Sequence, residues 1–332
     1  MKEISIKPST VKMLLPSLKS GGKACWTPGE VRDARIGCDG KAEESVPPAV
    51  IVSRMAKGGV GKTTVIANLG SALAMMGHKV LMVDGDPQAS LTGMFGVNPM
   101  DEDENIVHVG DLMHAFFSRQ PVDFTAAVKP IYVGGYLDLI PADITLVNAD
   151  PWLNGVLNRE LLFDRMLRGN QPFFGRYDAI LIDTAPATSL LTNALMLAGR
   201  ELLVVAMLNG SSMKALHVLE SNITEVNAAF PDLHMGIHIV ANGYHGSFAD
   251  CKKVLNRLAA TYGPLLDENV LPLSTSFRRQ DGVMDGEPSG PVLEREPSSE
   301  SAASVAALAR SLAARYGILL GGHPADASGG VL

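Results

Sequence analysis

Residues 57–64 read KGGVGKTT, and this stretch decides the fold of the chain. It follows a short apolar run, Ala49–Ser53, and opens a helical pattern, Lys62–Met76, which stops before Gly77. The glycines let backbone N–H groups curl around phosphate oxygens without clashes from Cβ atoms. The helix that follows adds unpaired donors and a positive dipole at its N-terminus. The order of strand, glycine-rich turn and helix therefore predicts a phosphate-binding loop.

Five further apolar runs alternate with helical stretches along the chain. These strand candidates are Lys79–Asp84, Ala179–Asp183, Glu201–Ala206, Gly236–Ala241 and Asn269–Leu273. Continuous apolar runs are typical of parallel strands that are covered on both faces. The alternation predicts an α/β fold, a doubly wound and mostly parallel sheet of the P-loop NTPase type with helices on both faces. Ligands of such a sheet bind at the carboxyl ends of its strands.

Carboxylates stand at the ends of two of these strands. Asp84 and Asp86 follow one strand and Asp183 ends another. Buried carboxylates are costly unless they meet a cation or hydrogen-bond donors. Each of them could cap the next helix, but together with the loop they suit a shell of water around Mg²⁺. In the same pattern Lys62 supplies a point charge to the β- and γ-phosphates, and the Thr63 hydroxyl can hold the metal.

The loop departs from the ordinary P-loop pattern at its head. Ala56 stands where that pattern has glycine, five residues before Gly61, and Lys57 is an extra lysine. The turn itself does not need a lysine there. Without further context, Lys57 is predicted to be an exposed lysine at the protein surface.

Composition limits the classes of protein that fit. The chain has 332 residues, of which 46% are hydrophobic, and a net charge of −7. The negative charge excludes a wholly basic nucleic-acid coat protein, so any contact with DNA requires a local basic patch. Three isolated cysteines without CxxC spacing argue against a disulfide framework and a structural zinc site. The sequence shows neither a secretory signal nor a long apolar span, which predicts a cytoplasmic protein.

Three regions are expected along the chain. Residues 1–47 show no sustained hydrophobic periodicity, and we expect them to form an extension, either a flexible arm or a small binding element. Within this extension Cys25–Ile36 could form one short helix, with Thr27 before Pro28 at its start. Residues 48–320 are expected to form the domain that carries the phosphate-binding loop. Residues 321–332 are rich in glycine and predict a disordered tail.

Three motifs together resemble the ParA/MinD ATPases over roughly Val50 to Arg315. KGGVGKTT, VDGDPQAS and ILIDTAPA, in this order, are similar to the deviant Walker A, the A′ element and the Walker B of that family. The DPQ sequence and LLTNAL at Leu190–Leu195 are most similar to the ParA partition branch. The chain departs from the family pattern at three places. Met55-Ala56 stands where many relatives have Asn-Gln, and Ala185 stands where they have proline. Leu273-Ser274 stands where they have Arg-Asn. The resemblance implies slow, Mg²⁺-dependent and partner-stimulated hydrolysis of ATP, with ATP and Mg²⁺ as cofactors.

Site residues follow from the resemblance position by position. Lys57 would reach across an ATP-sandwich dimer to the phosphates of the other subunit, Lys62 would bind the phosphates, and Asp86 would position the attacking water. Thr63 would bind Mg²⁺, and Asp84 and Asp183 would hold metal-bound waters. The implied nucleotide-binding residues are Lys57, Gly58, Gly59, Val60, Gly61, Lys62, Thr63, Thr64, Asn242 and Pro272.

The leading hypothesis is a partition ATPase for a plasmid, chromosome or mobile element. It would bind non-specific duplex DNA as an ATP homodimer on the nucleoid, and a centromere-binding, ParB-like partner would stimulate hydrolysis. An amphipathic helix over Asp250–Gly263 supplies the predicted DNA-binding residues together with the loop that follows: Lys252, Lys253, Arg257, Arg278 and Arg279. Two alternatives remain open, a positioning ATPase for a protein cargo and a MinD-like ATPase that cycles on membranes. The last helix, alanine-rich and followed by glycines, disfavours the membrane alternative.

Overall fold

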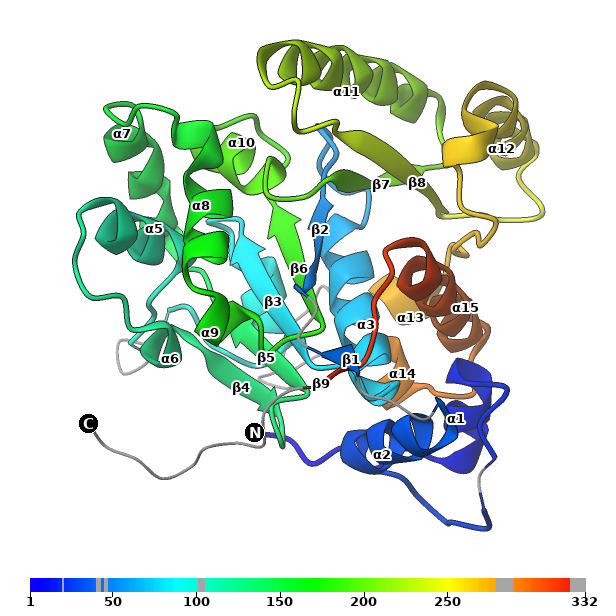
Figure 1. Ribbon diagram of the computed structural model, residues 1–332. Helices are drawn as coiled ribbons and strands as arrows, with labels where there is room; N and C mark the ends of the chain where they lie inside the picture. The colour runs from blue at the N-terminus through cyan, green and yellow to red at the C-terminus, as the bar shows by residue number, and fades with distance from the viewer. Residues whose placement is uncertain (20, 40–42, 45–46, 101–104, 279–289, 323–332) are drawn as a thin grey trace, which may run out of the picture.

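A seven-stranded sheet forms the centre of the computed structural model, which describes residues 1–19, 21–39, 43–44, 47–100, 105–278 and 290–322. The strands lie in the order β4-β5-β3-β6-β2-β7-β8 (Figure 1). Only β4 is antiparallel to its neighbour. Their bounds are β2 Ala49–Ser53, β3 Val80–Gly85, β4 Lys129–Tyr132, β5 Leu137–Ile140, β6 Ala179–Thr184, β7 Glu201–Met207 and β8 Gly236–Asn242. The predicted fold class is confirmed.

Five of the six predicted strands are present, and the sixth is wrong. Asn269–Leu273 forms no strand; Leu271 donates its N–H to the Ala241 carbonyl at 2.9 Å, and Pro272 bridges to Tyr244. Pro272 has no N–H to continue a ladder, so the run contacts β8 only at isolated points. The sequence interpretation also missed β4 and β5, which have only four residues each.

Two groups of helices cover the sheet. On one side α3 packs against α14 and α15, and on the other α10 packs against α7 and α8 (Figure 1). The bounds of these and the remaining helices after β2 are α3 Lys62–Met75, α4 Ser90–Met94, α5 Val109–Phe117, α6 Phe124–Ala127, α7 Ala149–Leu153, α8 Leu162–Gly169, α9 Gln171–Phe174, α10 Leu190–Met196, α11 Gly210–Ala229, α12 Ala249–Tyr262, α13 Thr275–Arg278, α14 Val292–Arg295 and α15 Glu300–Arg315. Three short 3₁₀ helices complete the set, η1 Ile144–Asn148, η2 Arg159–Leu161 and η3 Gly263–Leu265.

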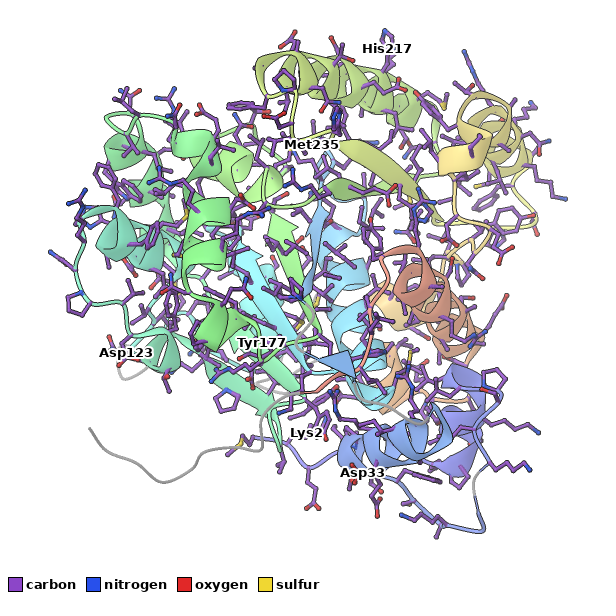
Figure 2. All side chains as sticks on the ribbon, viewed as in Figure 1. Lys2, Asp33, Asp123, Tyr177, His217 and Met235 are labelled. Atoms are coloured by element: carbon purple, nitrogen blue, oxygen red, sulfur yellow. The ribbon has the colours of Figure 1, made fainter. Side chains whose placement is uncertain are left out.

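The N-terminal segment packs on this core. It contains α1 (Pro8–Leu14) and α2 (Pro28–Asp39), and the side chains of Ile6, Leu14 and Trp26 are buried. Lys2 extends the sheet beside β4, donating its N–H to the Ile131 carbonyl at 2.7 Å (Figure 2). The expectation of a flexible arm is therefore wrong for the described part of the extension, because its apolar side chains are buried against the rest of the chain.

A buried ion pair joins α2 to the sheet. The Arg32 guanidinium donates to the Asp178 carboxylate at 2.7 Å and to the Gly77 carbonyl at 2.8 Å. Burial, with the nearby Arg35 guanidinium, lowers the pKa of the neighbouring His78 to about 3, so its ring is neutral. The short helix expected near Thr27 is confirmed: Thr27 and Glu30 bond reciprocally at its start, as in a capping box.

The C-terminal end of the chain is described as far as Gly322. Gly321–Gly322 form β9, which pairs with β1 (Glu43–Glu44). The predicted disorder of 323–332 lies outside the described residues. Within the described ranges, none of the helices combines the length and the apolar character that crossing a bilayer requires.

Candidate nucleotide-binding site

The predicted phosphate loop lies between β2 and α3, at the carboxyl end of the sheet. Gly59 and Gly61 have φ of 70° and 91°, a left-handed conformation that favours glycine. Helix α3 begins at Lys62, and no side chain caps its N-terminus. No side-chain cap therefore occupies the N-terminus of the helix, where a phosphate would meet its first amides.

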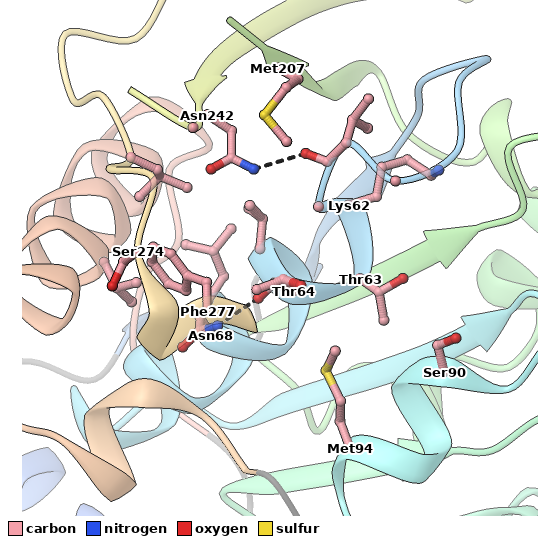
Figure 3. Close-up of a pocket in the computed structure, with 18 of the residues that line it drawn as sticks. Lys62, Thr63, Thr64, Asn68, Ser90, Met94, Met207, Asn242, Ser274 and Phe277 are labelled. Atoms are coloured by element: carbon pink, nitrogen blue, oxygen red, sulfur yellow. Dashed lines mark hydrogen bonds between the residues drawn. The ribbon is translucent and has the colours of Figure 1, made fainter. Parts of the chain in front are cut away.

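Asn242, at the end of β8, supports this loop from the side. Its Nδ2 donates to the Val60 carbonyl at 2.8 Å (Figure 3). A Cβ atom at Gly61 would lie only 2.5 Å from the same Nδ2, so this close approach requires glycine. The resemblance implied that Asn242 binds the nucleotide. In the structure Asn242 also lines the cavity, but its amide nitrogen holds the phosphate loop.

A polar cluster lies behind the loop, where β3 and β6 end side by side. Asp84 pairs with Asp183 in the register of these strands, and the Thr63 hydroxyl donates to Asp183 Oδ2 at 2.6 Å. The N–H and hydroxyl of Thr92 both donate to Asp84 Oδ2, at 2.9 and 2.7 Å. The structure therefore brings together the three residues predicted to serve the metal.

This cluster fits Mg²⁺ chemically. Asp183 Oδ1 is buried and has no hydrogen-bond partner, so one carboxylate oxygen remains available. Burial raises the pKa of Asp183 to about 7 and that of Asp84 to about 6, and for Asp183 the neighbouring Asp84 carboxylate contributes further. Mg²⁺ prefers hard oxygen ligands and water-mediated carboxylates, which Thr63, Asp84 and Asp183 provide.

Without Mg²⁺, the two aspartates are expected to make the protein less stable as the pH rises from about 4 to about 7. Their raised pKa values mean that the folded protein retains protons which the unfolded chain releases near the ordinary value of 3.8. Where the folded state binds more protons, the free energy of unfolding falls with increasing pH. Thermal melts in a chelator, compared with melts of Asp183→Asn, measure this effect. The variant should show a weaker pH dependence, and an equal dependence in both proteins would contradict the assignment.

The cavity beside the loop has a volume of ≈ 500 Å³. Its phosphate end is formed by residues 58–64, and Asp86 stands on its wall. Its other lining residues include the apolar Met207, Leu271, Pro272 and Phe277 and the polar Asn68, Asn242 and Ser274. Ser274 and Phe277 lie on the side of the cavity away from Lys62 (Figure 3). A glycine-rich phosphate loop beside a wall that is partly apolar can accept the polyphosphate and the base of a nucleotide. The predicted Pro272 lines the same cavity.

Lys62 and Lys57 take different positions. Lys62 is buried, and burial lowers its pKa while the nearby Asp183 carboxylate opposes that change. Lys57 is half-buried and turns to the start of α11 in its own chain. Its Nζ donates to Asn209 Oδ1 at 3.2 Å and to Ser211 Oγ at 2.5 Å. Lys57 does not line the cavity of its own subunit.

The structure describes the position of some of the predicted DNA-binding residues but not of all. Lys252, Lys253 and Arg257 are exposed on α12, while Cys251, Leu258 and Tyr262 form its buried side. Lys253 lies 3.5 Å from the Asp250 carboxylate on the same helix. Arg278 ends α13, and Arg279 lies outside the described residues.

Two residues at the site were missed by the sequence interpretation. Arg54, between β2 and the loop, is buried and bonds to the segment after β6. Asn209 holds Lys57. The signal for Arg54 was an arginine in an otherwise apolar run, whereas nothing local marks Asn209.

Comparisons with known proteins agree with this geometry. The model of a family described as "AAA domain" matches residues 49–235, which is more than half of the chain. The chain is 30% identical over 231 residues to the chromosome partitioning protein ParA of Caulobacter vibrioides, covering 68% of this chain and 81% of the relative. It is 31% identical over 273 residues to an uncharacterized protein of Mycobacterium tuberculosis, covering 82% of this chain and 80% of the relative.

A similar fold is found among solved structures. The cobyrinic acid a,c-diamide synthase of Mycobacterium smegmatis, with a bound ATP analogue and magnesium, superposes with a TM-score of 0.65. The two chains are 23% identical, and the match covers 83% of this chain and 100% of the other. At this identity the likeness establishes the fold alone.

Proposed function

This chain belongs to the ParA- and MinD-like P-loop ATPases of the AAA domain family, and from that premise we propose that it is a DNA-partition ATPase. In this proposal it closes into a homodimer around ATP, binds duplex DNA without sequence preference, and leaves the DNA after hydrolysis. A centromere-binding, ParB-like partner stimulates that hydrolysis, and the protein works on the nucleoid in the cytoplasm. The observation that carries the proposal is the cluster of Thr63, Asp84 and Asp183 behind the phosphate loop.

The proposed chemistry depends mainly on positioning and charge. When bound, Mg²⁺ would neutralise charge that develops on the phosphates. Thr63 and the two buried aspartates would hold the metal and its waters, and Lys62 would contact the phosphates from its buried position. Asp86, on the cavity wall, orients the attacking water. Lys57 serves the other subunit, since it stands outside its own cavity.

The proposed DNA contact is the exposed face of α12. Lys252, Lys253 and Arg257 can neutralise phosphates but carry no means of reading base edges. One such face gives weak binding, with a dissociation constant on the order of 10⁻⁴–10⁻⁶ M. A dimer joins two faces and retains DNA by multivalency. The proposal therefore links ATP, dimer size and DNA affinity.

The triple variant Lys252→Glu, Lys253→Glu, Arg257→Glu is expected to lose DNA binding by at least about 10-fold while it still forms the ATP dimer. The three residues are exposed and distant in sequence from the phosphate loop, so basal hydrolysis should remain unchanged. Fluorescence anisotropy with random duplex, over a salt series, measures the affinity. The slope of log affinity against log salt should fall by about one for each phosphate that the variant no longer neutralises.

Light scattering with ADP or ATP, with and without DNA, separates the candidate functions. Dimer formation and DNA binding that both require ATP support partition. An ATP-dependent dimer that does not bind DNA would favour the alternative of a positioning ATPase for a protein cargo. Sedimentation of the protein with anionic liposomes would favour the alternative of a membrane-cycling ATPase. The charge-conserving variant Lys252→Arg, Lys253→Arg is the matched control and should bind DNA as the wild type does.

A further inference from the structure

Arg54 occupies a position that its chemistry makes costly. It is only 1% exposed and is among the largest fully buried side chains of the described residues. It stands directly between the last residue of β2 and the phosphate loop. A guanidinium retains its charge when buried, so this position requires compensation from its surroundings.

The Arg54 guanidinium donates to one segment, the loop 185–188 that joins β6 to α10. Its Nη1 donates to the carbonyls of Ala185 and Pro186 at 3.2 and 3.1 Å, and its Nη2 donates to the Thr188 hydroxyl at 3.1 Å. That loop begins just after Asp183, and its Pro186 lines the cavity. One side chain thus ties the segment after the β6 carboxylate to the start of the phosphate loop.

The stability of the fold does not by itself explain why an arginine occupies this buried position. Its acceptors are neutral oxygens, its Nε is buried without a hydrogen-bond partner, and burial lowers its pKa. Its charge also lowers the pKa of the nearby Lys62, so two buried cations lie close together beside the phosphate loop. A methionine of similar length would avoid the cost of burying an unpaired charge. The fork of donors, which holds several loop atoms at once, is what a methionine lacks.

We propose that Arg54 is a positioning residue for hydrolysis, which holds loop 185–188 in one place relative to the phosphate loop. The loop carries Pro186 to the wall of the cavity that Asp86 also lines. This inference rests on the proposed ATPase function and adds a residue to it. Because a displacement of about 1 Å can cost 10²-fold in rate, a freely moving loop should slow the chemical step more than it weakens binding.

The variant Arg54→Met is expected to lower kcat by about 10-fold or more, with the dissociation constant for ATP within about threefold of the wild-type value. Arg54→Lys keeps the charge but has a single ammonium that cannot reproduce the fork, so it should restore little of the rate. Full restoration by lysine would overturn the proposal, because charge alone would then suffice. A wild-type kcat in folded Arg54→Met would overturn it as well.

Two further variants keep the test decisive. Thr188→Val removes one acceptor and leaves Arg54 in place; it should lower kcat several-fold, and an unchanged kcat would count against the proposal even where Arg54→Met fails to fold. Arg315→Met is the matched control, since Arg315 pairs with Glu201 at 2.7 Å at the other end of β7. Its kcat and KM should match the wild type.

Hydrogen exchange separates this inference from the proposed function. The amides of residues 184–189, measured with the full chain, should exchange faster in Arg54→Lys than in wild type. If the wild type binds ATP but does not hydrolyse it, the proposed function fails while faster exchange still supports the role of Arg54. Equal exchange in both proteins contradicts that role whatever the hydrolysis assay gives.

Discussion

Replacing Lys57 by alanine is expected to slow ATP hydrolysis by about 10²–10³-fold and to abolish the ATP-dependent dimer. The reason is its position: the residues that line the cavity begin at Gly58, and the Lys57 ammonium is held outside by Asn209 and Ser211. In the proposed dimer its charge would therefore be dispensable for nucleotide binding in its own subunit and would act on the phosphates of the other. Affinity for ATP should stay within about threefold of wild type.

Phosphate release and light scattering measure the two effects on Lys57→Ala. Lys214→Ala is the matched control, because Lys214 is an exposed lysine on α11, the helix whose start holds Lys57. The control should hydrolyse ATP and dimerise as the wild type does. Hydrolysis at the wild-type rate in Lys57→Ala would show that the lysine has no role in the second subunit.

Replacing Asp86 by alanine is expected to produce the opposite effect on the dimer, an ATP-bound form that persists on DNA. Of the three aspartates, Asp86 is the one that lines the cavity. Asp84 is engaged by Thr92, and Asp183 accepts the Thr63 hydroxyl. Asp86 Oδ1 accepts the Gln88 N–H at 3.0 Å, but Asp86 is the aspartate that faces the cavity, so it is the carboxylate proposed to orient water. Its loss should slow hydrolysis by about 10²-fold while the residues that bind ATP stay intact.

The persistence of Asp86→Ala on DNA can be followed by dissociation in excess competitor duplex with ATP present. Asp232→Ala, which removes an exposed carboxylate from the loop before β8, is the control and should dissociate as the wild type does. Turnover of Asp86→Ala at the wild-type rate would mean that another group positions the water.

The phosphate loop and the strand carboxylates could be predicted because their evidence is local. The glycines of residues 57–64 and the start of α3 are neighbours in sequence, and parallel strands bring their carboxyl ends to one edge. Asp84 and Asp183 could therefore be placed together before any contact was known. The register of β3 and β6 pairs these two residues.

Features that depend on contacts between distant segments could not be predicted. The packing of α1 and α2 depends on side chains such as Trp26 that find their partners elsewhere in the chain, and Arg32 reaches Asp178 across 146 positions. The contact of Asn242 with Val60 likewise spans 182 positions. Strand β4 escaped prediction because Lys129 and Pro130 open a run of only four residues, too short for a clear alternation.

The contact between Asn242 and Val60 has a consequence for how ATP and the DNA of the proposed function would influence each other. Asn242 ends β8, and residues 243–248 lead from it to α12, so the phosphate loop and the basic helix are connected through the end of β8. Thermodynamic reciprocity then applies: by whatever factor ATP raises the affinity for DNA, DNA must raise the affinity for ATP. The nucleoid would thus act as an effector, and dimers would close at a lower concentration of ATP where DNA is dense than where it is sparse.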